Sequence, residues 1–403
     1  MTEHDGVARH GAADATLPTV GVEEEFLTVD PATQRPVPLA SDVLARVPAV
    51  AVSAEFKGEL LASQIETAST VTSGLAELRA GLRDSRTALA SAAAAVGADL
   101  HSAGFALDHT VPLAVSRDER YRAIEERYAG VTADYPACGC HVHVGVPDRE
   151  TAVAVVNHLR PWLPTLLALS ANSPYARGVD SGCASWRAVS QRRFPGAGVP
   201  PWCADAAAYD RAMDAQLAAG ATVDRQMTFW YARPSEHVPT VEVRAADAAA
   251  TVDEAVLQAG LTRALVVRAL HDLAAGRTAP PTGDGVAAAA VWAAARYGLD
   301  GPAVDFADGR TTSALSLVGK LLTHAAPGLE ESGDGQLVRT YLHRIVRQGT
   351  GAARQRRAAA RGGLAAAAGV VAIRPDPPPE PLAVVGGTAH DFARPTPDCG
   401  RMR

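Results

Sequence analysis

The stretch "GVEEEF", residues 21–26, places three carboxylates side by side in a segment that is typical of a buried strand. Because successive side chains of a strand point to opposite faces, Glu23 and Glu25 share one face, and Glu24 lies on the other with apolar neighbours. Two carboxylates about 7 Å apart on one face repel each other unless a cation lies between them. The pattern indicates either a cation site or a solvated edge strand that carries three surface acids.

Three further segments carry polar groups among apolar residues. These are "GELLASQIE" with Glu59 and Glu66, "CHVHV" with His141 and His143 on one face, and "TVEVR" with Glu242 and Arg244 on one face. A lone histidine on an apolar strand is more often a satisfied core residue than a ligand, but four such segments together favour a shared site. If their faces line one concave sheet, they form a cavity of carboxylates with a histidine and arginines at its rim.

Such a cavity suits a hard divalent cation. Mg²⁺ and Mn²⁺ prefer carboxylate oxygens, and Mg²⁺ usually bridges protein acids to substrate phosphates, whereas zinc would favour more histidine or cysteine. Arginines beside the acids would hold a carboxylate or a phosphate through paired hydrogen bonds. Acids, metals and arginines together indicate phosphoryl chemistry, in which positioning and charge neutralisation supply most of the rate.

The usual glycine-rich nucleotide loops are missing from the sequence. No GxxxxGK[ST] occurs, and "LVGKLL" lacks both the upstream glycine and the following hydroxyl. Neither "GAGVPP" nor "GTGAAR" completes GxGxxG. If ATP binds here, metals rather than a glycine loop must hold its phosphates.

The patterns along the chain predict which elements position these residues. Alternation predicts strands within residues 19–30, 56–69, 137–146 and 240–247. Ser73 is expected to cap a long helix over residues 74–100, and Asp148 a helix that runs through residues 152–171. From Thr251 onward nearly all segments are predicted to be helical. The order predicts an α+β domain with an antiparallel sheet and a helical C-terminal region.

Composition indicates a protein that works inside the cell. The chain has 403 residues, 47% of them hydrophobic, and a net charge of −6, which gives no support for a nucleic-acid or membrane partner. Its five cysteines form no CxxC pair, and the first residues lack the pattern of a signal peptide, so we expect a cytoplasmic location. Residues 1–17 and 371–403 are expected to be disordered tails around a single domain, residues 18–370. A homodimer is left open.

Taken in order, the motifs resemble those of a known family of carboxylate–amine ligases, the glutamate–cysteine ligase type 2 family. The resemblance covers residues 19–365 and rests on "GVEEEF", "ELLASQIETAS", "CGCHVHVGVPDRE", "ANSPYARGVDSGCASWR", "RPSEHVPTVEVRAAD" and "GTGAARQR". It implies a fold similar to the catalytic domain of glutamine synthetase, with a curved antiparallel sheet that cups ATP and several Mg²⁺ (or Mn²⁺) ions. It also implies ATP-dependent joining of a carboxylate, typically the γ-carboxylate of glutamate, to an amine such as cysteine, through an acyl phosphate. Its partners are then small molecules.

The resemblance also implies roles for individual residues. The metal ligands implied are Glu23, Glu25, Glu59, Glu66, His141 and Glu242. Arg244 and Arg187 are implied as catalytic, and Arg233, His143 and Ser185 as binding the substrate or the nucleotide. Glu24 is expected to be structural, and Cys138, Cys140 and Cys183 to be packing residues rather than nucleophiles.

Some positions depart from the family pattern. After "ANSP", the chain has Ala176-Arg177 where a bulky aromatic residue is expected, and Ser181 and Cys183 where threonine and tyrosine are expected. Phe194-Pro195 stands where a Trp-Pro pair is expected. These changes leave the acids intact and concern the choice of acceptor. Two alternatives stay open: a metal-dependent amidohydrolase that uses the HxH strand, and a non-catalytic family member.

Overall fold

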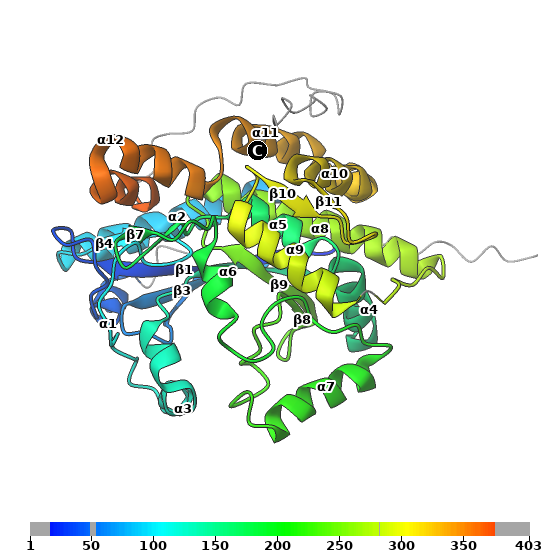
Figure 1. The fold of residues 1–403 in the computed structure, drawn as a ribbon, viewed down its shortest axis with the longest axis horizontal. Coiled ribbons are helices and arrows are strands. Elements are labelled where there is room, and N and C mark those ends of the chain that lie inside the picture. Colours follow the sequence, from blue (N-terminus) through cyan, green and yellow to red (C-terminus); the bar gives the residue numbers. More distant parts are fainter. Residues whose placement is uncertain (1–16, 49–53, 282, 375–403) are drawn as a thin grey trace, which may run out of the picture.

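The centre of the protein is a seven-stranded antiparallel sheet, seen in a computed structural model that describes residues 17–48, 54–281 and 283–374 (Figure 1). Along the sheet the order is β2 (Ala54–Gly58), β3 (Gln64–Ser69), β1 (Val20–Val29), β5 (Gly139–Gly145), β9 (Thr240–Asp247) and β8 (Ala232–Pro234), and β4 (Asp99–His101) also pairs with β1. Two small hairpins lie outside it: β6 (Tyr175–Ala176) with β7 (Val179–Asp180), and β10 (Pro302–Val304) with β11 (Thr311–Ser313). The predicted α+β class with an antiparallel sheet is confirmed.

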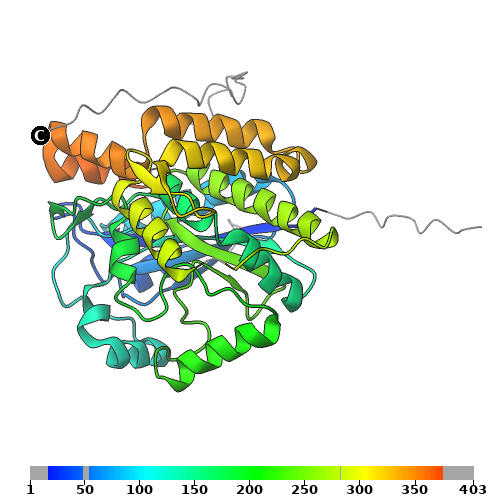
Figure 2. The same cartoon turned by 45° about the vertical axis from the view of Figure 1, so that its right-hand side comes forward.

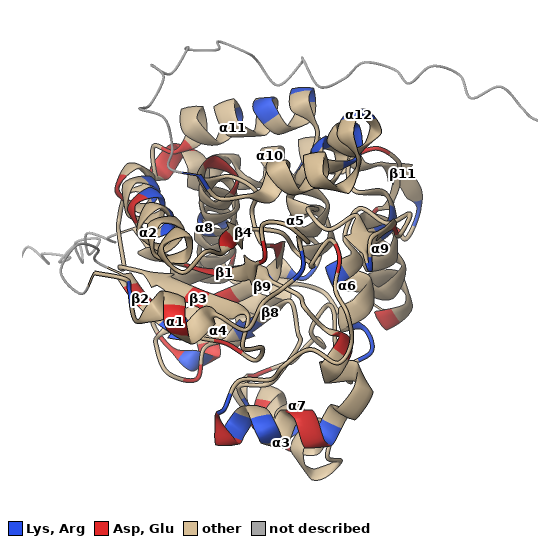
Figure 3. Ribbon diagram, turned by 90° about the vertical axis from the view of Figure 1, so that its left-hand side faces the viewer, with Lys and Arg blue, Asp and Glu red and all other residues tan. Residues whose placement is uncertain are grey.

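Helices cover the sheet on one side in two layers (Figures 1 and 2). Nearest the sheet lie α2 (Leu75–Ala95), α4 (Arg149–Leu159), α5 (Leu163–Ser170) and α8 (Val252–Ala274), and beyond them α10 (Ala314–Glu331), α11 (Gly335–Gln348) and α12 (Gly351–Val371). The remaining helices are α1 (Ala40–Leu44), α3 (Glu119–Tyr128), η1 (Ala129–Asp134), α6 (Trp186–Gln191), α7 (Ala206–Ala218) and α9 (Asp284–Tyr297). Of these, α3 and α7 lie on the opposite side of the sheet, and both carry many charged residues (Figure 3).

The main core fills the space between the sheet and its first helical layer. Alternate residues of β1, β5 and β9 point into it, among them Val22, Val142 and Val243, each at most 3% exposed. They pack against apolar residues of α8 such as Val256. Because side chains alternate along a strand, the residues between these valines must point to the other face, which is the polar one.

Several predicted boundaries are wrong in detail. Residues 56–69 form parts of two strands, β2 and β3, so Glu59 lies in the connection between them rather than on a strand. The N-cap of α2 is Gly74, not Ser73, and this helix ends at Ala95. Asp148 does cap α4 by accepting a hydrogen bond from the Thr151 N–H, as predicted. The helix then breaks at residues 160–162, because Pro161 cannot donate a backbone hydrogen bond.

The described chain stays packed beyond residue 371, the predicted start of the C-terminal tail. Helix α12 ends at Val371, which is fully buried, and the Ile373 N–H donates to the Leu100 carbonyl over 2.8 Å. Ala372 forms a bridge with His101, so this stretch packs against β4. The predictions for residues 1–16 and 375–403 lie outside the described residues. Within the part that is described, no helix is long and apolar enough to cross a membrane.

Candidate active site

The polar face of the sheet gathers almost all of the acids and histidines singled out in the sequence. The strand registers place Glu23 opposite His141, Glu25 opposite Glu66, and His143 opposite Glu242. Arg233 on β8 lies opposite Glu242 in turn. Neighbouring strands therefore bring together charged groups that are up to about 220 residues apart in the chain, from Glu23 to Glu242.

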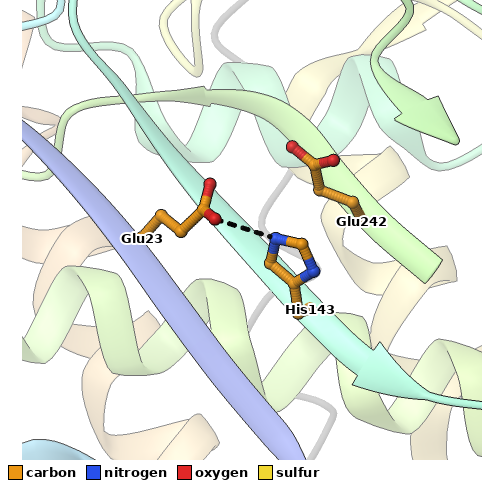
Figure 4. Close-up of side chains that lie close together, drawn as sticks. All are labelled: Glu23, His143 and Glu242. Carbon is orange, nitrogen blue, oxygen red and sulfur yellow. Dashed lines mark ion pairs between the residues drawn. The ribbon is translucent and has the colours of Figure 1, made fainter. Parts of the chain in front are cut away.

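Glu23, His143 and Glu242 form a cluster whose geometry suits a metal ion (Figure 4). One ligand atom from each of the three lies within 4.8 Å of the others. His143 Nε2 is 3.4 Å from Glu23 Oε1, and His141 Nδ1 is 3.1 Å from Glu23 Oε2. The cluster therefore offers two carboxylates and an imidazole converging on one point, with His141 beside them.

The electrostatics keep these carboxylates ionised. Burial alone would raise the pKa of Glu23, but hydrogen bonds from His141 and His143 hold that pKa well below its usual range. Burial would likewise raise the pKa of Glu242, and the positive charges of Arg233 and Arg244 hold it far below normal instead. Both groups are thus in the charged form that a cation requires.

The histidines differ in their surroundings. Burial, helped by the charge of Arg244, lowers the pKa of His141, which favours the neutral imidazole. Burial lowers the pKa of His143. The hydrogen bond to Glu23 and the charge of Glu242 outweigh this effect, so the pKa lies above its usual value. Its Nδ1 is 3.0 Å from the Thr240 hydroxyl oxygen, so Nε2 is the ring nitrogen that faces the carboxylates.

A second group of acids lies further along the same face. Glu66 is 6% exposed, and burial together with the charges of Glu23 and Glu59 raises its pKa well above the usual value. Its Oε1 has Lys57 Nζ 3.0 Å away as its ion partner. Burial and the charge of Glu25 raise the pKa of Glu59 as well. These carboxylates repel one another, so a divalent cation between them would be strongly favoured.

The three predicted arginines are held in different ways. Arg233 Nε donates to Glu242 Oε2 over 2.6 Å, and Arg244 pairs with the other oxygen of the same carboxylate. The guanidinium of Arg187 instead donates to two backbone carbonyls of β9, those of Arg244 and Ala245, over 3.1 and 3.4 Å. Arg187 therefore keeps its charge beside the cluster without a carboxylate in direct hydrogen-bond contact.

A pocket opens between this polar face and the segments around α3. Five of the predicted residues line it: Glu25, Glu59, His141, Arg187 and Arg244. Its other walls include Arg120 and Ile124 of α3, Tyr135, Gln191, and residues 226–229. Sequence reasoning missed these walls, because they lie on a charged helix and in loops whose patterns carry no signal for a site.

The other predicted residues are not part of the pocket lining. Glu23, Glu66, His143, Arg233 and Glu242 belong to the polar face but do not line the pocket itself. Ser185 is fully buried, and its hydroxyl donates to Asp247 Oδ1 over 2.8 Å and accepts from the Ala188 N–H. Its contacts are those of a helix cap, and a role in substrate binding stays a prediction.

A family model and several known proteins are similar to this chain over most of its length. The family model described as Glutamate-cysteine ligase family 2 matches residues 19–369. A putative glutamate–cysteine ligase 2-2 of Saccharopolyspora erythraea is 53% identical over 341 residues, which cover 84% of this chain and 87% of that protein. A putative glutamate–cysteine ligase 2 of Salinispora arenicola is 46% identical over 339 residues, 84% of this chain and 89% of that one.

Solved structures share the fold at low identity. A glutamate–cysteine ligase from Francisella tularensis, in complex with AMP, superposes with a TM-score of 0.66 at 11% identity and covers 88% of each chain. A bifunctional glutathione synthetase from Pasteurella multocida gives 0.63 at 12% identity, over 87% of this chain and 51% of that one. These likenesses show that the chain shares its fold with both solved proteins.

Proposed function

The chain belongs to the glutamate–cysteine ligase family 2, a family of ATP-dependent carboxylate–amine ligases, and we propose that its own reaction joins the γ-carboxylate of glutamate to an amine such as that of cysteine. The observation that carries this proposal is the cluster of Glu23, His143 and Glu242, which contacts His141 and Arg244 of the pocket lining. It combines cation ligands with anion-binding groups, as phosphoryl transfer to a carboxylate requires.

The residues present fit divalent cations. One ligand atom from each of Glu23, His143 and Glu242 already converges on a common point. We assign Glu23, His143 and Glu242, with His141 beside them, to one cation, and Glu25, Glu59 and Glu66 to further cations. Hard oxygen ligands favour Mg²⁺ or Mn²⁺. When bound, such ions neutralise the phosphates of ATP and polarise the γ-phosphorus.

The protein's own groups orient the reactants. Arg187 and Arg244 are placed to bind the anionic oxygens of the donor and of the transferred phosphoryl group, and Arg233 keeps Glu242 in position. In the first step a donor carboxylate oxygen attacks the γ-phosphorus and ADP leaves, which forms the acyl phosphate. In the second step the neutral amine attacks the acyl carbon, and phosphate leaves with the donor's oxygen.

The alternatives differ in what they demand of the site. An amidohydrolase built on the HxH strand would give no task to Glu25, Glu66 or the arginines, and the family favours the ligase. A non-catalytic relative would keep the fold without turnover.

For the location we propose the cytoplasm, since the four described cysteines, Cys138, Cys140, Cys183 and Cys203, are all free.

Isotope transfer tests the proposed reaction. Glutamate labelled with ¹⁸O in its γ-carboxylate is incubated with ATP, Mg²⁺ and a panel of amines including cysteine. We expect one label in the released phosphate, and amide product equal to the phosphate formed. Unlabelled phosphate formed with the amide would overturn the acyl phosphate. Absence of ATP turnover with every amine would instead support the non-catalytic alternative.

A further inference from the structure

Asp247, at the end of β9, has no role in the reaction described so far, yet two other segments of the chain donate hydrogen bonds to its carboxylate. Its carboxylate is fully buried. Oδ2 accepts hydrogen bonds from the Asn172 N–H over 2.9 Å and the Ser173 hydroxyl over 2.7 Å, and Oδ1 accepts from the Ser185 hydroxyl over 2.8 Å. A buried carboxylate with three donors is a costly group that a fold keeps only in a defined position.

Two of these contacts, those of the Ser173 and Ser185 hydroxyls, lead to Arg187. The Ser173 hydroxyl that donates to Asp247 accepts from the Arg187 backbone N–H over 3.1 Å. The Ser185 hydroxyl caps α6, the short helix on which Arg187 is the second residue. Asp247 Oδ1 also lies 3.9 Å from Arg187 Nη1, near enough for direct attraction. One carboxylate thus holds the two serine hydroxyls that contact the backbone around Arg187, and it also faces the guanidinium at 3.9 Å.

The surroundings leave Asp247 no freedom to move. A Cβ placed on Gly104 would lie 2.4 Å from Asp247 Cγ, so the chain passes directly against the carboxylate. On the far side, the Asn172 side chain donates to the Ser102 and Ala248 carbonyls and accepts from Gln355 of α12. The segments "ANSP", "ASWR", "VRAAD" and "GTGAARQR" therefore meet in one network around Asp247.

From this network we infer that Asp247 is a positioning residue for the reaction. It orients Arg187, which has no other carboxylate within 4 Å among the described residues and which lines the pocket. The inference rests on the proposed function in so far as Arg187 binds the anionic reactants. Misplacing such a group by about 1 Å can lower the rate by about 10²-fold.

Chemical labelling tests the positioning without any turnover. In Asp247→Asn the amide offers one acceptor in place of two, so one serine hydroxyl loses its partner and the charge facing Arg187 disappears. We expect phenylglyoxal, followed by mass spectrometry, to modify Arg187 roughly tenfold faster than in the wild type, because its site opens locally. Arg263, which is 1% exposed and remote from this network, should stay protected. Unchanged labelling of Arg187, or an equal increase at Arg263, would overturn the inference.

A second variant and a matched control distinguish a local change at Arg187 from a general destabilisation of the fold. Ser173→Ala removes the acceptor for the Arg187 N–H but leaves the carboxylate, and it should raise the labelling of Arg187 to a smaller extent. Asp272→Asn replaces another buried aspartate, which binds Arg268 and Arg277 of the helical layer, and should leave the labelling of Arg187 unchanged.

Steady-state kinetics give an independent reading once ATP turnover is established. Asp247→Asn should lower kcat/KM by about 100-fold in the wild-type background. In an Arg187→Met background the same change should have little further effect, because Asp247 acts through Arg187. Additive losses in the double variant would overturn the inference while leaving the ligase reaction intact. Failure of the labelled-phosphate experiment, in contrast, would leave the labelling prediction standing.

Discussion

Glu23 and Glu24 are neighbours in the sequence, but their carboxylates lie on opposite faces of the sheet and have opposite environments. Glu24 points to the helical layer, where it pairs with Arg86 of α2 over 2.6 Å, and both side chains are at most 6% exposed. Glu23 points to the polar face and contacts His141 and His143. One carboxylate is thus part of the core, and the next belongs to the proposed cation site.

The Glu24–Arg86 pair predicts a loss of stability without a loss of cation binding. In Glu24→Gln, the Arg86 guanidinium keeps the Ala249 carbonyl as an acceptor but stays buried without its counter-ion. We expect the free energy of unfolding to fall by about 3 kcal/mol, because breaking one side of a buried ion pair leaves an uncompensated charge. Urea unfolding measures this, and titration with Mn²⁺ should show unchanged affinity. A stability equal to that of the wild type would contradict the assignment.

Substitution of Glu23 should weaken cation binding without lowering stability. Glu23→Gln removes one ligand of the cluster, and we expect the affinity for Mn²⁺ to fall by roughly 10- to 100-fold, with ATP turnover lost. The melting temperature in EDTA should stay near that of the wild type, since Glu23 is only partly buried. Glu77→Gln, an exposed acid on α2, is the matched control. Normal Mn²⁺ affinity and turnover in Glu23→Gln would contradict the assignment of a cation site to this face of the sheet.

Glu242→Gln should lose cation binding and also stability. This carboxylate separates Arg233 from Arg244, and without its charge the two guanidinium groups repel each other in a buried site. We expect Mn²⁺ affinity to fall as in Glu23→Gln, and the free energy of unfolding in EDTA to fall by about 3 kcal/mol. If Glu242→Gln binds Mn²⁺ normally, Glu242 is only a partner of the arginines.

Two truncations test where the packed chain ends. A chain that stops after residue 374 keeps Val371 and the pairing of Ile373 with Leu100, and should unfold at the same temperature as the full chain. A chain that stops after residue 369 loses the full burial of Val371, at about 1.5 kcal/mol or more, and the partial burial of Ile373. Differential scanning calorimetry should therefore show a clear drop for the shorter chain only. Equal melting temperatures for both would mean that residues 370–374 add nothing.

His101 predicts a dependence of stability on pH. Burial lowers the pKa of this histidine to about 4, from an ordinary value near 6.5. The unfolded chain therefore binds more protons between pH 6.5 and 4, so the contribution is present above pH 6.5 and is lost as the pH falls. At pH 5 the loss from this group is about 2 kcal/mol. Between pH 7 and 5, urea unfolding should show that the free energy of unfolding falls less in His101→Leu than in the wild type, and that the difference is about this amount.

A buried apolar neighbour provides the control for this comparison. Leu100 lies beside His101 on β4 and is 2% exposed but has no titratable group, so Leu100→Val should lose as much stability between pH 7 and 5 as the wild type does. If His101→Leu loses as much as the wild type, the pH dependence of stability comes from other groups.

The sequence by itself determined which residues share a face. A strand alternates with a period of two, so "GVEEEF", "CHVHV" and "TVEVR" already separate Glu23, His141 and Glu242 from the valines between them. The same local patterns predicted the α+β class and the cap at Asp148. The ordered motifs carried the resemblance to the family, which the comparison then confirmed.

Only the tertiary structure decided which of these residues meet. Strand order and register depend on contacts between distant segments, and they place His143 opposite Glu242 and Glu66 opposite Glu25. The pocket walls from α3 and residues 226–229 have no periodic signal, because loops are positioned by packing rather than by their own pattern. The same holds for Asp247. Its hydrogen bonds come from residues 172–173 and from Ser185, which are distant in the sequence, so no local spacing encodes them.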